Sequence, residues 1–232
     1  MARRQGVRVL YGTLRGIGSV AGRVLYRPAI EGLENVPAHG PVILASNHLS
    51  FADSVVIPLV VPRRVRFLAK TEYFDSPGVK GRLSRLAFSS LGALPVKRGA
   101  GRDAMTALEA GLSVLRAGEA FGIYPEGTRS RDGRLYRGRT GVGHLALASG
   151  APVVPVALFG TEHIQPVGAR MPRLHPIRVR FGSPLDFSEG YGHLRPGQAR
   201  RLVTDEVMAA IHALSGQARA DHYNDPGVDR AA

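Results

Sequence analysis

The sequence predicts an α/β fold: a single domain with a mostly parallel central sheet of about seven strands, flanked by helices. Short apolar runs alternate along the chain with longer segments whose apolar residues recur every three or four positions. Such alternation is typical of strand–helix–strand units around a parallel sheet. The chain has 232 residues, of which 44% are hydrophobic, and this is enough for one domain with a sizeable core.

The first 27 residues predict a basic amphipathic helix in front of this domain. Its apolar side chains follow the helical period, while Arg8, Arg15 and Arg23 fall on another side. Such a helix can lie in a bilayer interface or pack on the domain, and both interpretations remain open. The same arginines interrupt the apolar core that a secretory signal needs, so no signal peptide is expected.

From Pro28 onward the pattern predicts seven strands and five helices. The strands are expected at residues 29–32, 42–46, 65–69, 93–96, 121–124, 153–159 and 177–181. The helices are expected at residues 53–61, 79–90, 102–117, 141–149 and 196–214. The folded domain is therefore expected over residues 28–215, with its motifs within 41–160. The polar residues 216–232 are expected to form a flexible tail.

The longest apolar run, PVILASNHLSFADSVVIPLVVP, is not expected to cross a membrane. Its centre holds Asn47, His48, Ser50, Asp53 and Ser54. A helix in lipid needs about 20 apolar residues and rarely accepts so many polar groups. The run therefore predicts a strand, a turn and then a helix.

The chain is strongly basic and contains no cysteine. The lack of cysteine excludes disulfides, thiolate metal sites and a cysteine nucleophile. The net charge is +13, and only three of the 31 basic residues are lysines. Arginine suits phosphate and carboxylate, so an anionic partner is expected: nucleic acid, an anionic membrane surface or a small phosphorylated substrate. Because the sequence has no nucleic-acid motif, no nucleic-acid partner is expected.

Three polar clusters directly follow predicted strands. NHLSFAD follows residues 42–46, KRG follows 93–96, and PEGTRSRDG follows 121–124. In open α/β sheets, ligands bind beyond the carboxyl ends of the strands. These segments are distant in sequence, and they are expected to converge on one pocket.

His48 and Asp53 in the first cluster suit general-base chemistry. Histidine can act as a base near neutral pH, and an aspartate one helical turn later can accept a hydrogen bond from one ring nitrogen. Asp53 could also cap the following helix, and the two roles are compatible. No G-x-S-x-G elbow supplies a serine nucleophile. The attacking group is therefore expected to belong to the substrate, most simply an alcohol.

The other clusters contain parts that bind phosphate. Lys70, Arg98 and Arg129 are cations at strand ends, and Gly127 and Thr128 add backbone N–H groups and a hydroxyl. A base for an alcohol beside such an anion clamp indicates acyl transfer onto a phosphorylated alcohol. The run RSRDGRLYRGR is either a solvated loop or a surface that faces an anionic bilayer.

These segments resemble, in order and spacing, the motifs of the glycerolipid acyltransferases, above all the bacterial 1-acyl-sn-glycerol-3-phosphate (lysophosphatidic acid) type. NHLSFAD is similar to the first block of that family, the HX4D motif. LAKTEYF resembles its AK-x-E element, LGALPVKRG its second block, YPEGTRS its third and VVPVAL its fourth. The resemblance covers about residues 28–182.

The resemblance implies a mechanism. His48, oriented by Asp53, would deprotonate the free hydroxyl of lysophosphatidic acid, which would attack an acyl thioester without an acyl-enzyme and give phosphatidic acid. It also implies which residues bind the acceptor. The residues that would bind its phosphate are Lys70, Arg98, Thr128 and Arg129. Those that would shape the acceptor site are Asn47, Glu126, Gly127 and Pro155.

The resemblance also implies partners and a location. Acyl-CoA is the expected donor, with acyl carrier protein as a further candidate, and no metal or organic cofactor is required. The enzyme is expected at the cytoplasmic face of the cell membrane, as a peripheral or monotopic protein on an anionic surface. Two departures affect the membrane contact and the acyl channel. One basic helix replaces the usual N-terminal hydrophobic hairpin, and the loop of residues 75–85 is unusually basic.

Two other functions stay open on the sequence. The acceptor could be another lysophospholipid or a phosphoinositol-type glycolipid, although an acceptor without a terminal phosphate would need fewer cations. Alternatively, the chain could bind anionic membranes without catalysis. The two classes differ in what they expect of a His48→Ala variant, which should lose turnover only if the chain is an enzyme.

Overall fold

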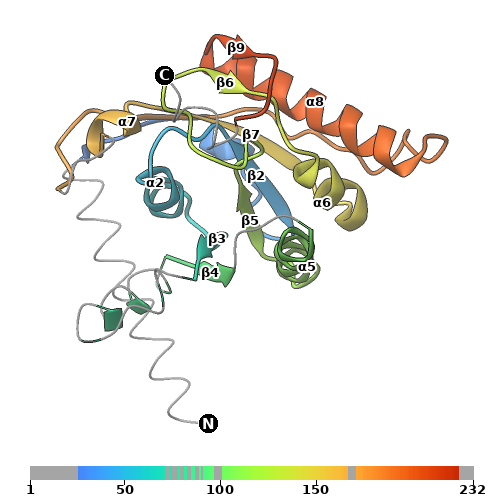
Figure 1. Ribbon diagram of the computed structural model, residues 1–232, viewed down its shortest axis with the longest axis horizontal. Helices are drawn as coiled ribbons and strands as arrows, with labels where there is room; N and C mark the ends of the chain where they lie inside the picture. The colour runs from blue at the N-terminus through green and yellow to red at the C-terminus, as the bar shows by residue number, and fades with distance from the viewer. Residues whose placement is uncertain are drawn as a thin grey trace.

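The computed structural model describes residues 26–71, 91–96, 101–166 and 171–224, with single positions between 74 and 89. In this part of the chain, seven strands form one sheet in the order β1-β8-β7-β2-β5-β3-β4 (Figure 1). Its neighbouring strands run parallel except β7 and β8, which are antiparallel. The strands are β1 (Ala29–Glu31), β2 (Val42–Ser46), β3 (Val65–Lys70), β4 (Ala93–Val96), β5 (Ala120–Ile123), β7 (Val153–Phe159) and β8 (Arg178–Phe181). The predicted fold class is confirmed.

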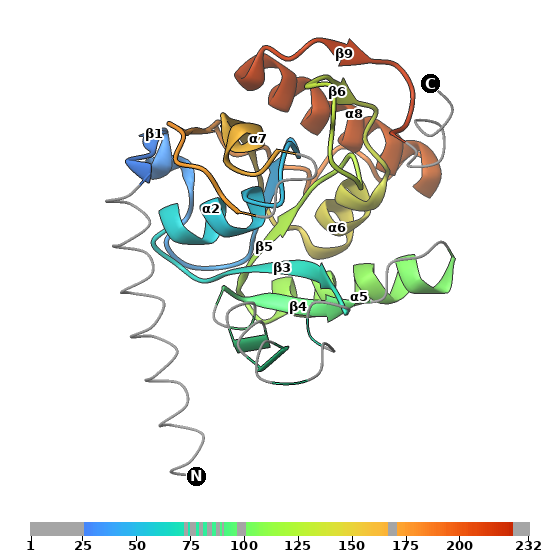
Figure 2. The same cartoon turned by 60° about the vertical axis from the view of Figure 1, so that its left-hand side comes forward.

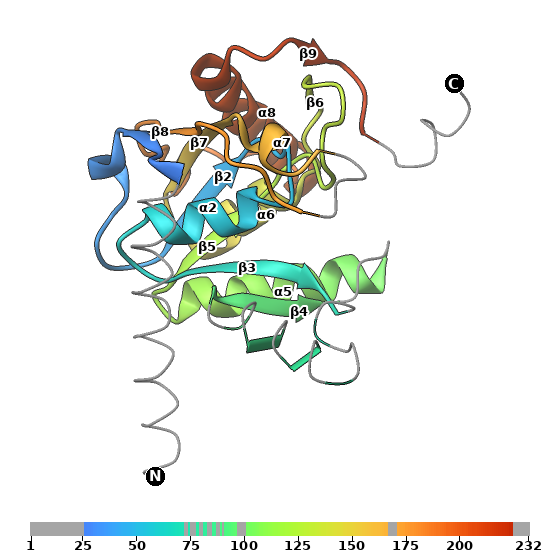
Figure 3. The same cartoon turned by 90° about the vertical axis from the view of Figure 1, so that its left-hand side faces the viewer.

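Helices cover both faces of the sheet, and the side chains of β2 show how. Val42 and Leu44 pack in the core beneath α2 (Asp53–Val60), which lies in front of the sheet in Figure 3. Ile43 and Ala45 point the other way, into the core under three further helices. These are α5 (Arg102–Arg116), α6 (Gly141–Ser149) and α8 (Pro196–Ser215). A strand buried on both faces reads as an unbroken apolar run, as this one does.

Local sequence sets the ends of the longer helices. α8 begins at Pro196, whose missing N–H and fixed φ suit a first helical turn. Both α6 and α8 end at a glycine in the left-handed region, Gly150 with φ 65° and Gly216 with φ 64°. One face of α8 is buried against the domain: Ala199, Val203, Val207 and Ile211.

The predicted elements agree closely with the observed ones. All seven predicted strands of the sheet are present, and four predicted helices are present, each with ends within one residue of the prediction. The fifth predicted helix, 79–90, falls mostly outside the described residues, and so does the N-terminal helix of residues 1–27. The sequence missed four short elements: η1 (Leu33–Asn35), β6 (Leu135–Tyr136), α7 (Thr161–Ile164) and β9 (Arg219–Ala220).

The C-terminal segment corrects a prediction. We expected residues 216–232 to form a flexible tail, but the described part, up to Asn224, packs on the domain. β9 pairs with β6 beside α8, and both Ala220 and Asn224 are buried (Figure 2). A two-residue strand has no periodicity to detect, and its polar neighbours Gln217 and Asn224 bond to other parts of the domain. Residues 225–232 lie outside the described residues.

The apolar run of residues 41–62 forms β2, a turn and α2, as predicted. Its polar centre lies in that turn. Among the residues that the structure describes, no helix is both long and apolar enough to cross a bilayer.

Candidate active site

The loops that follow β2 and β5 meet beyond the carboxyl edge of the sheet. These strands are parallel neighbours, so both loops leave at the same edge. The Ser130 N–H donates to the carbonyl oxygen of His48 at 2.7 Å. The His48 N–H in turn donates to Oε1 of Glu126 at 3.0 Å. Two of the three predicted clusters therefore converge, as the sequence indicated.

His48 and Asp53 form a buried pair at the start of α2. Nδ1 of His48 lies 2.8 Å from Oδ2 of Asp53, whose side chain is 0% exposed. The same oxygen accepts the backbone N–H groups of Leu49 at 2.7 Å and Ser50 at 2.8 Å. Because an ionised carboxylate can only accept, Nδ1 of His48 carries the proton and Nε2 keeps a free lone pair.

This arrangement refines the predicted capping role of Asp53. The N-cap position belongs to Ala52, and Asp53 is the first residue of the helix. Asp53 binds N–H groups that precede the helix, so it folds the turn that carries His48 back toward α2. Its other oxygen, Oδ1, is buried and has no hydrogen-bond partner within the described part of the chain.

The imidazole of His48 packs against a stack of two aromatic rings, Tyr124 and Phe67. The imidazole lies 3.8 Å from the ring of Tyr124, with 9° between the planes, and Tyr124 lies 5.5 Å from Phe67. The Tyr124 hydroxyl is 3.0 Å from Oγ of Ser54, one residue after Asp53. Sequence reasoning missed Tyr124. Its place between β5 and the PEGT motif was the available signal.

Gly122 makes room for this stack. A Cβ atom at Gly122 would lie 2.0 Å from Cζ of Phe67, far inside van der Waals contact. Only glycine lets the Phe67 ring cross β5 at that point and reach Tyr124.

Glu126 joins two loops through its buried carboxyl group. Oε1 accepts the N–H of His48 and Oε2 accepts the N–H of Tyr136, each at 3.0 Å. The side chain is fully buried, and burial raises the pKa of Glu126 to about 7, against the lowering effect of the two backbone bonds. Its role in shaping the acceptor site stays a prediction, but its contacts are with the backbone that carries His48.

Asn47 fixes the start of the same loop. Its Nδ2 donates to the carbonyl oxygen of Leu158 at 3.1 Å, and its Oδ1 accepts the N–H of Leu158 at 2.8 Å. The amide thus continues the pairing of β2 with β7 by one residue. Nδ2 also donates to Oε1 of Gln217 at 2.8 Å. Gln217 lies 170 residues away in sequence, and no sequence pattern pointed to it.

Residues 128–139, called here the arginine loop, contain five arginines, and the N–H of Ser130 in this loop bonds to the carbonyl oxygen of His48. Of the two predicted phosphate-binding residues in this loop, Arg129 is exposed and Thr128 is half-buried. Gly127, just before the loop, has φ 79°, a left-handed turn that favours glycine. The carbonyl oxygen of Arg129 accepts Nδ2 of Asn224 at 3.0 Å. The remaining arginines of the loop are Arg131, Arg134, Arg137 and Arg139.

Asp132 organises the middle of the arginine loop. Burial works against its ionisation, but the side chain and backbone N–H of Arg134 and the hydroxyls of Tyr136 and Ser130 donate to it. Together these bonds lower the pKa of Asp132 to about 2. These contacts give Asp132 a structural role within the loop.

Three predicted site residues, Lys70, Arg98 and Pro155, are not shown to lie beside His48 at the carboxyl edge of the sheet. Lys70 ends β3, opposite Val96 of β4, and its side chain is not described. Arg98 lies outside the described residues. Pro155 lies within the sheet, level with Ala45, and a Cβ at Gly182 would meet its ring at 2.9 Å. Pro155 therefore packs inside the sheet and does not lie at the carboxyl edge where His48 is found.

Comparison with known proteins shows which protein family the chain belongs to. A family model described as Acyltransferase matches residues 27–159. The chain belongs to the acyltransferase family. His48, Asp53 and Glu126 lie within that match, whereas β8, α8 and β9 follow it.

Individual acyltransferases are similar over most of the chain. A chloroplastic 1-acyl-sn-glycerol-3-phosphate acyltransferase of Brassica napus is 36% identical over 78% of this chain and 51% of its own length. A 1-acyl-sn-glycerol-3-phosphate acyltransferase of Bacillus subtilis is 25% identical over 79% of this chain and 86% of its own. The chain thus spans about half the length of its plant relative and most of the bacterial one.

A solved acyltransferase structure shares the fold. The crystal structure of the 1-acyl-sn-glycerophosphate acyltransferase of Thermotoga maritima is 26% identical, with a TM-score of 0.65. The likeness covers 91% of this chain and 82% of that one, so it extends beyond residue 159.

No metal centre is visible in the part of the chain that the structure describes. It contains no group of three or more histidine, aspartate or glutamate side chains placed to hold an ion. The expectation that this acyltransferase needs no metal or organic cofactor stays a prediction.

Proposed function

We propose that the chain transfers an acyl group from an acyl thioester to the free hydroxyl of 1-acyl-sn-glycerol-3-phosphate, giving phosphatidic acid. One observation carries the proposal. Asp53 holds Nδ1 of His48 at 2.8 Å and leaves Nε2 as a base, on a fold shared with relatives that carry this activity in their names.

The transfer needs one base and no protein nucleophile. Nε2 of His48 takes the proton from the acceptor hydroxyl as its oxygen bonds to the thioester carbonyl carbon. The carbon–sulfur bond then breaks, and the proton passes from His48 to the departing thiolate. Asp53 stabilises the transient imidazolium, and such general-base assistance is worth about 10²–10⁴ in rate.

The nearby serines support direct transfer without an acyl-enzyme. Oγ of Ser46 donates to the backbone of Asn47, and Oγ of Ser130 donates to Asp132. Oγ of Ser50 accepts the N–H of Ala52. None of these hydroxyls is bonded to His48 in the described residues, so none is prepared as a nucleophile.

The arginine loop suits the acceptor's phosphate. Arg129 is exposed one residue before Ser130, whose N–H bonds to His48, so a phosphate held there would lie close to the base. Guanidinium groups bind phosphate in a bidentate fashion. Thr128 and the turn at Gly127 are proposed to assist, and Lys70 and Arg98 are proposed to complete the anion clamp.

An apolar cavity offers space for a lipid chain. It measures about 370 Å³ and lies along α2, where it is lined mainly by apolar side chains that include Phe51, Val55 and Leu59. Phe51 follows His48 by three residues. The donor is proposed to be acyl-CoA, or acyl carrier protein, since both carriers are anionic and the chain has a net charge of +13.

The test is a substrate panel. Purified wild type and His48→Ala are incubated with lysophosphatidic acid, other lysophospholipids and a phosphoinositol glycolipid, each with acyl-CoA or acyl carrier protein thioester. Mass spectrometry identifies the products. We expect phosphatidic acid from the wild type and at least about a 100-fold lower rate from His48→Ala. Product from another acceptor alone would redirect the proposal, and no product from any acceptor would refute it.

A further inference from the structure

The segment of residues 217–224, called here the C-terminal strap, lies across the arginine loop. It lies beyond the part of the chain that the family model matches. The backbones of the two segments are bonded at both ends of β6. The Leu135 N–H donates to Ala218 O at 2.9 Å, and the Arg137 N–H donates to His222 O at 3.1 Å. β9 pairs with β6 between these bonds.

Two side chains of the strap extend this contact to the active site. Gln217 accepts from Nδ2 of Asn47 at 2.8 Å and donates through Nε2 to the carbonyl oxygen of Gly133 at 2.7 Å. It thereby links the residue before His48 to the arginine loop. At the other end, Nδ2 of Asn224 donates to the carbonyl oxygen of Arg129 at 3.0 Å.

The strap also contacts two of the positive charges in the arginine loop through the ring of Tyr223. The ring of Tyr223 lies 5.3 Å from the guanidinium carbon of Arg137 and 5.3 Å from that of Arg139, and each is a cation–π contact. Nη1 of Arg201 on α8 lies 3.4 Å from the Tyr223 hydroxyl. Five arginines against one acid within twelve residues leave a net positive charge that opposes close packing of the loop, and these contacts act against that repulsion.

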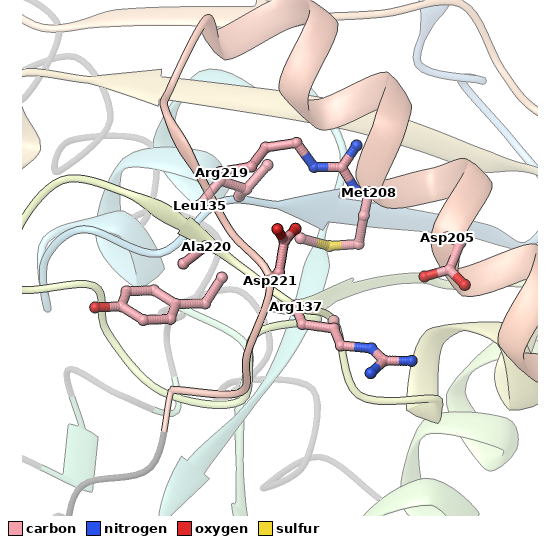
Figure 4. Close-up of a pocket in the computed structure, with 9 residues that line it drawn as sticks. Leu135, Arg137, Asp205, Met208, Arg219, Ala220 and Asp221 are labelled. Carbon is pink, nitrogen blue, oxygen red and sulfur yellow. The ribbon is translucent and has the colours of Figure 1, made fainter. Parts of the chain in front are cut away.

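Close packing contributes less to the position of the strap. A cavity of about 290 Å³ remains between the strap, β6 and α8. Figure 4 shows Arg219, Ala220 and Asp221 on one side of it, and Asp205 and Met208 on α8. Because the strap spans this space, its hydrogen bonds and the β6–β9 pairing fix its position.

We propose that Gln217 and Asn224 are positioning residues for the acyl acceptor. They hold the arginine loop, and Arg129 in particular, beside His48, so that the phosphate site exists before the substrate arrives. Preorganisation of this kind lowers the cost of binding without changing the chemical step. The inference rests on the proposed function, because it assigns the acceptor's phosphate to Arg129.

The test uses two conservative variants of the full chain. Gln217→Glu keeps the acceptor for Asn47 but removes the donor to Gly133, and Asn224→Ala removes the bond to Arg129. The control is Asp221→Asn, an exposed strap residue whose side chain has no hydrogen bond within the described part of the chain. For each protein, kcat and the KM of both substrates are measured, together with hydrogen exchange of peptides from the arginine loop and from β2.

We expect the KM for lysophosphatidic acid to rise about threefold to tenfold in both variants, the size expected for one lost hydrogen bond. The kcat, the KM for the thioester and the values of the control should stay within about twofold of wild type. The loop peptides should exchange faster while the β2 peptide does not. Monoacylglycerol, which lacks phosphate, should react equally with all four proteins.

Two results would overturn the inference. One is an arginine loop that exchanges as slowly in both variants as in the wild type. The other is an unchanged KM for the phosphorylated acceptor beside a lowered kcat, which would indicate general damage to the fold. An inactive wild type would count against the proposed function alone, because the exchange measurement still decides whether the strap holds the loop.

Discussion

His48 owes its proposed role to Asp53, one oxygen of which bonds both to the imidazole and to the backbone of the turn that carries it. Oδ2 of Asp53 receives Nδ1 of His48 and two N–H groups of the turn, all within 2.8 Å. One carboxylate thus fixes the tautomer and orientation of the ring and the path of the chain that carries it. A substitution that keeps an acceptor for the backbone N–H groups but removes the charge separates the two functions.

Asp53→Asn should lower kcat by about 10²–10⁴ while the fold persists. An amide oxygen can still accept the backbone N–H groups, but a neutral side chain does not stabilise the imidazolium, and it can present an N–H to Nδ1 and reverse the tautomer. Steady-state kinetics and circular dichroism test this, with Asp186→Asn on the surface as the control. Near-normal kcat in a folded Asp53→Asn protein would contradict the role of the pair.

Glu126 predicts how stability depends on pH. Its pKa is about 7 in the fold against an ordinary value of 4.5, so between these values the folded protein holds one more proton than the unfolded chain. The unfolding free energy from this group is therefore highest below about pH 4 and falls as pH rises through about 7, by about 3 kcal/mol.

Urea unfolding of the wild type and Glu126→Gln at several pH values measures this contribution. The variant has no titrating group at residue 126, so subtraction of its unfolding free energy removes the other groups. The difference, wild type minus variant, should decrease between about pH 4 and pH 8. A difference that stays constant or rises with pH would show that burial does not raise the pKa.

Among the secondary-structure elements, the sequence predicted those that have a repeating pattern. The strands of the sheet are apolar runs, and helices α5 and α8 show a clear period, so their ends fell within one residue of the prediction. β6 and β9 have two residues each and no period. They exist because the arginine loop and the C-terminal strap meet in space, which local sequence does not encode.

In the candidate active site, too, the sequence predicted what a local pattern encodes and missed what depends on distant contacts. His48 and Asp53 are five residues apart, so a motif reveals them. The contact of Asn47 with Gln217 joins residues 170 positions apart, and the stack of His48 on Tyr124 joins the loops that follow β2 and β5. Such contacts depend on strand order, which one sequence read by its local patterns does not give.

The stack from β3 through β5 to His48 gives a prediction about Gly122. In Gly122→Ala the new Cβ would overlap Phe67, so the ring must move and Tyr124 must follow it. We expect the unfolding free energy to fall by about 1–3 kcal/mol and kcat to fall with it. Urea denaturation and steady-state kinetics provide the two values.

Two further variants isolate the cause. Phe67→Leu in the same chain removes the overlapping ring edge and should restore part of the stability. Gly197→Ala, where a Cβ meets nothing within 4 Å, should leave both values near wild type. If Gly122→Ala loses stability but keeps full kcat, then the aromatic stack does not position His48.

At the scale of the whole molecule, charge and exposed apolar groups set the affinity that we expect for a lipid surface. The net charge of +13 attracts an anionic bilayer, and salt screens that attraction, with a Debye length of about 10 Å at 0.1 M and about 3 Å at 1 M. Among the described residues, the most exposed large apolar side chains are Met171 (76%) and Leu174 (66%). Both lie between α7 and β8, beside Pro172, which lines the apolar cavity along α2.

We therefore expect the segment around Met171 and Leu174 to enter the bilayer interface and to add an apolar contribution that salt does not screen. The variant Met171→Asp with Leu174→Asp should bind anionic vesicles more weakly than the wild type, and the deficit should persist in high salt. A matched control places the same two changes on Met105 of α5 and Leu202 of α8, which are 54% and 52% exposed.

Vesicle sedimentation at low and high salt compares the three proteins. The control carries the same net charge as the test variant, so it should show the same loss of electrostatic attraction. It should nevertheless keep the salt-resistant part of the binding, because its substitutions lie on other elements. Equal binding of the two double variants in high salt would mean that this segment does not enter the bilayer, and that charge alone brings the described domain to the membrane.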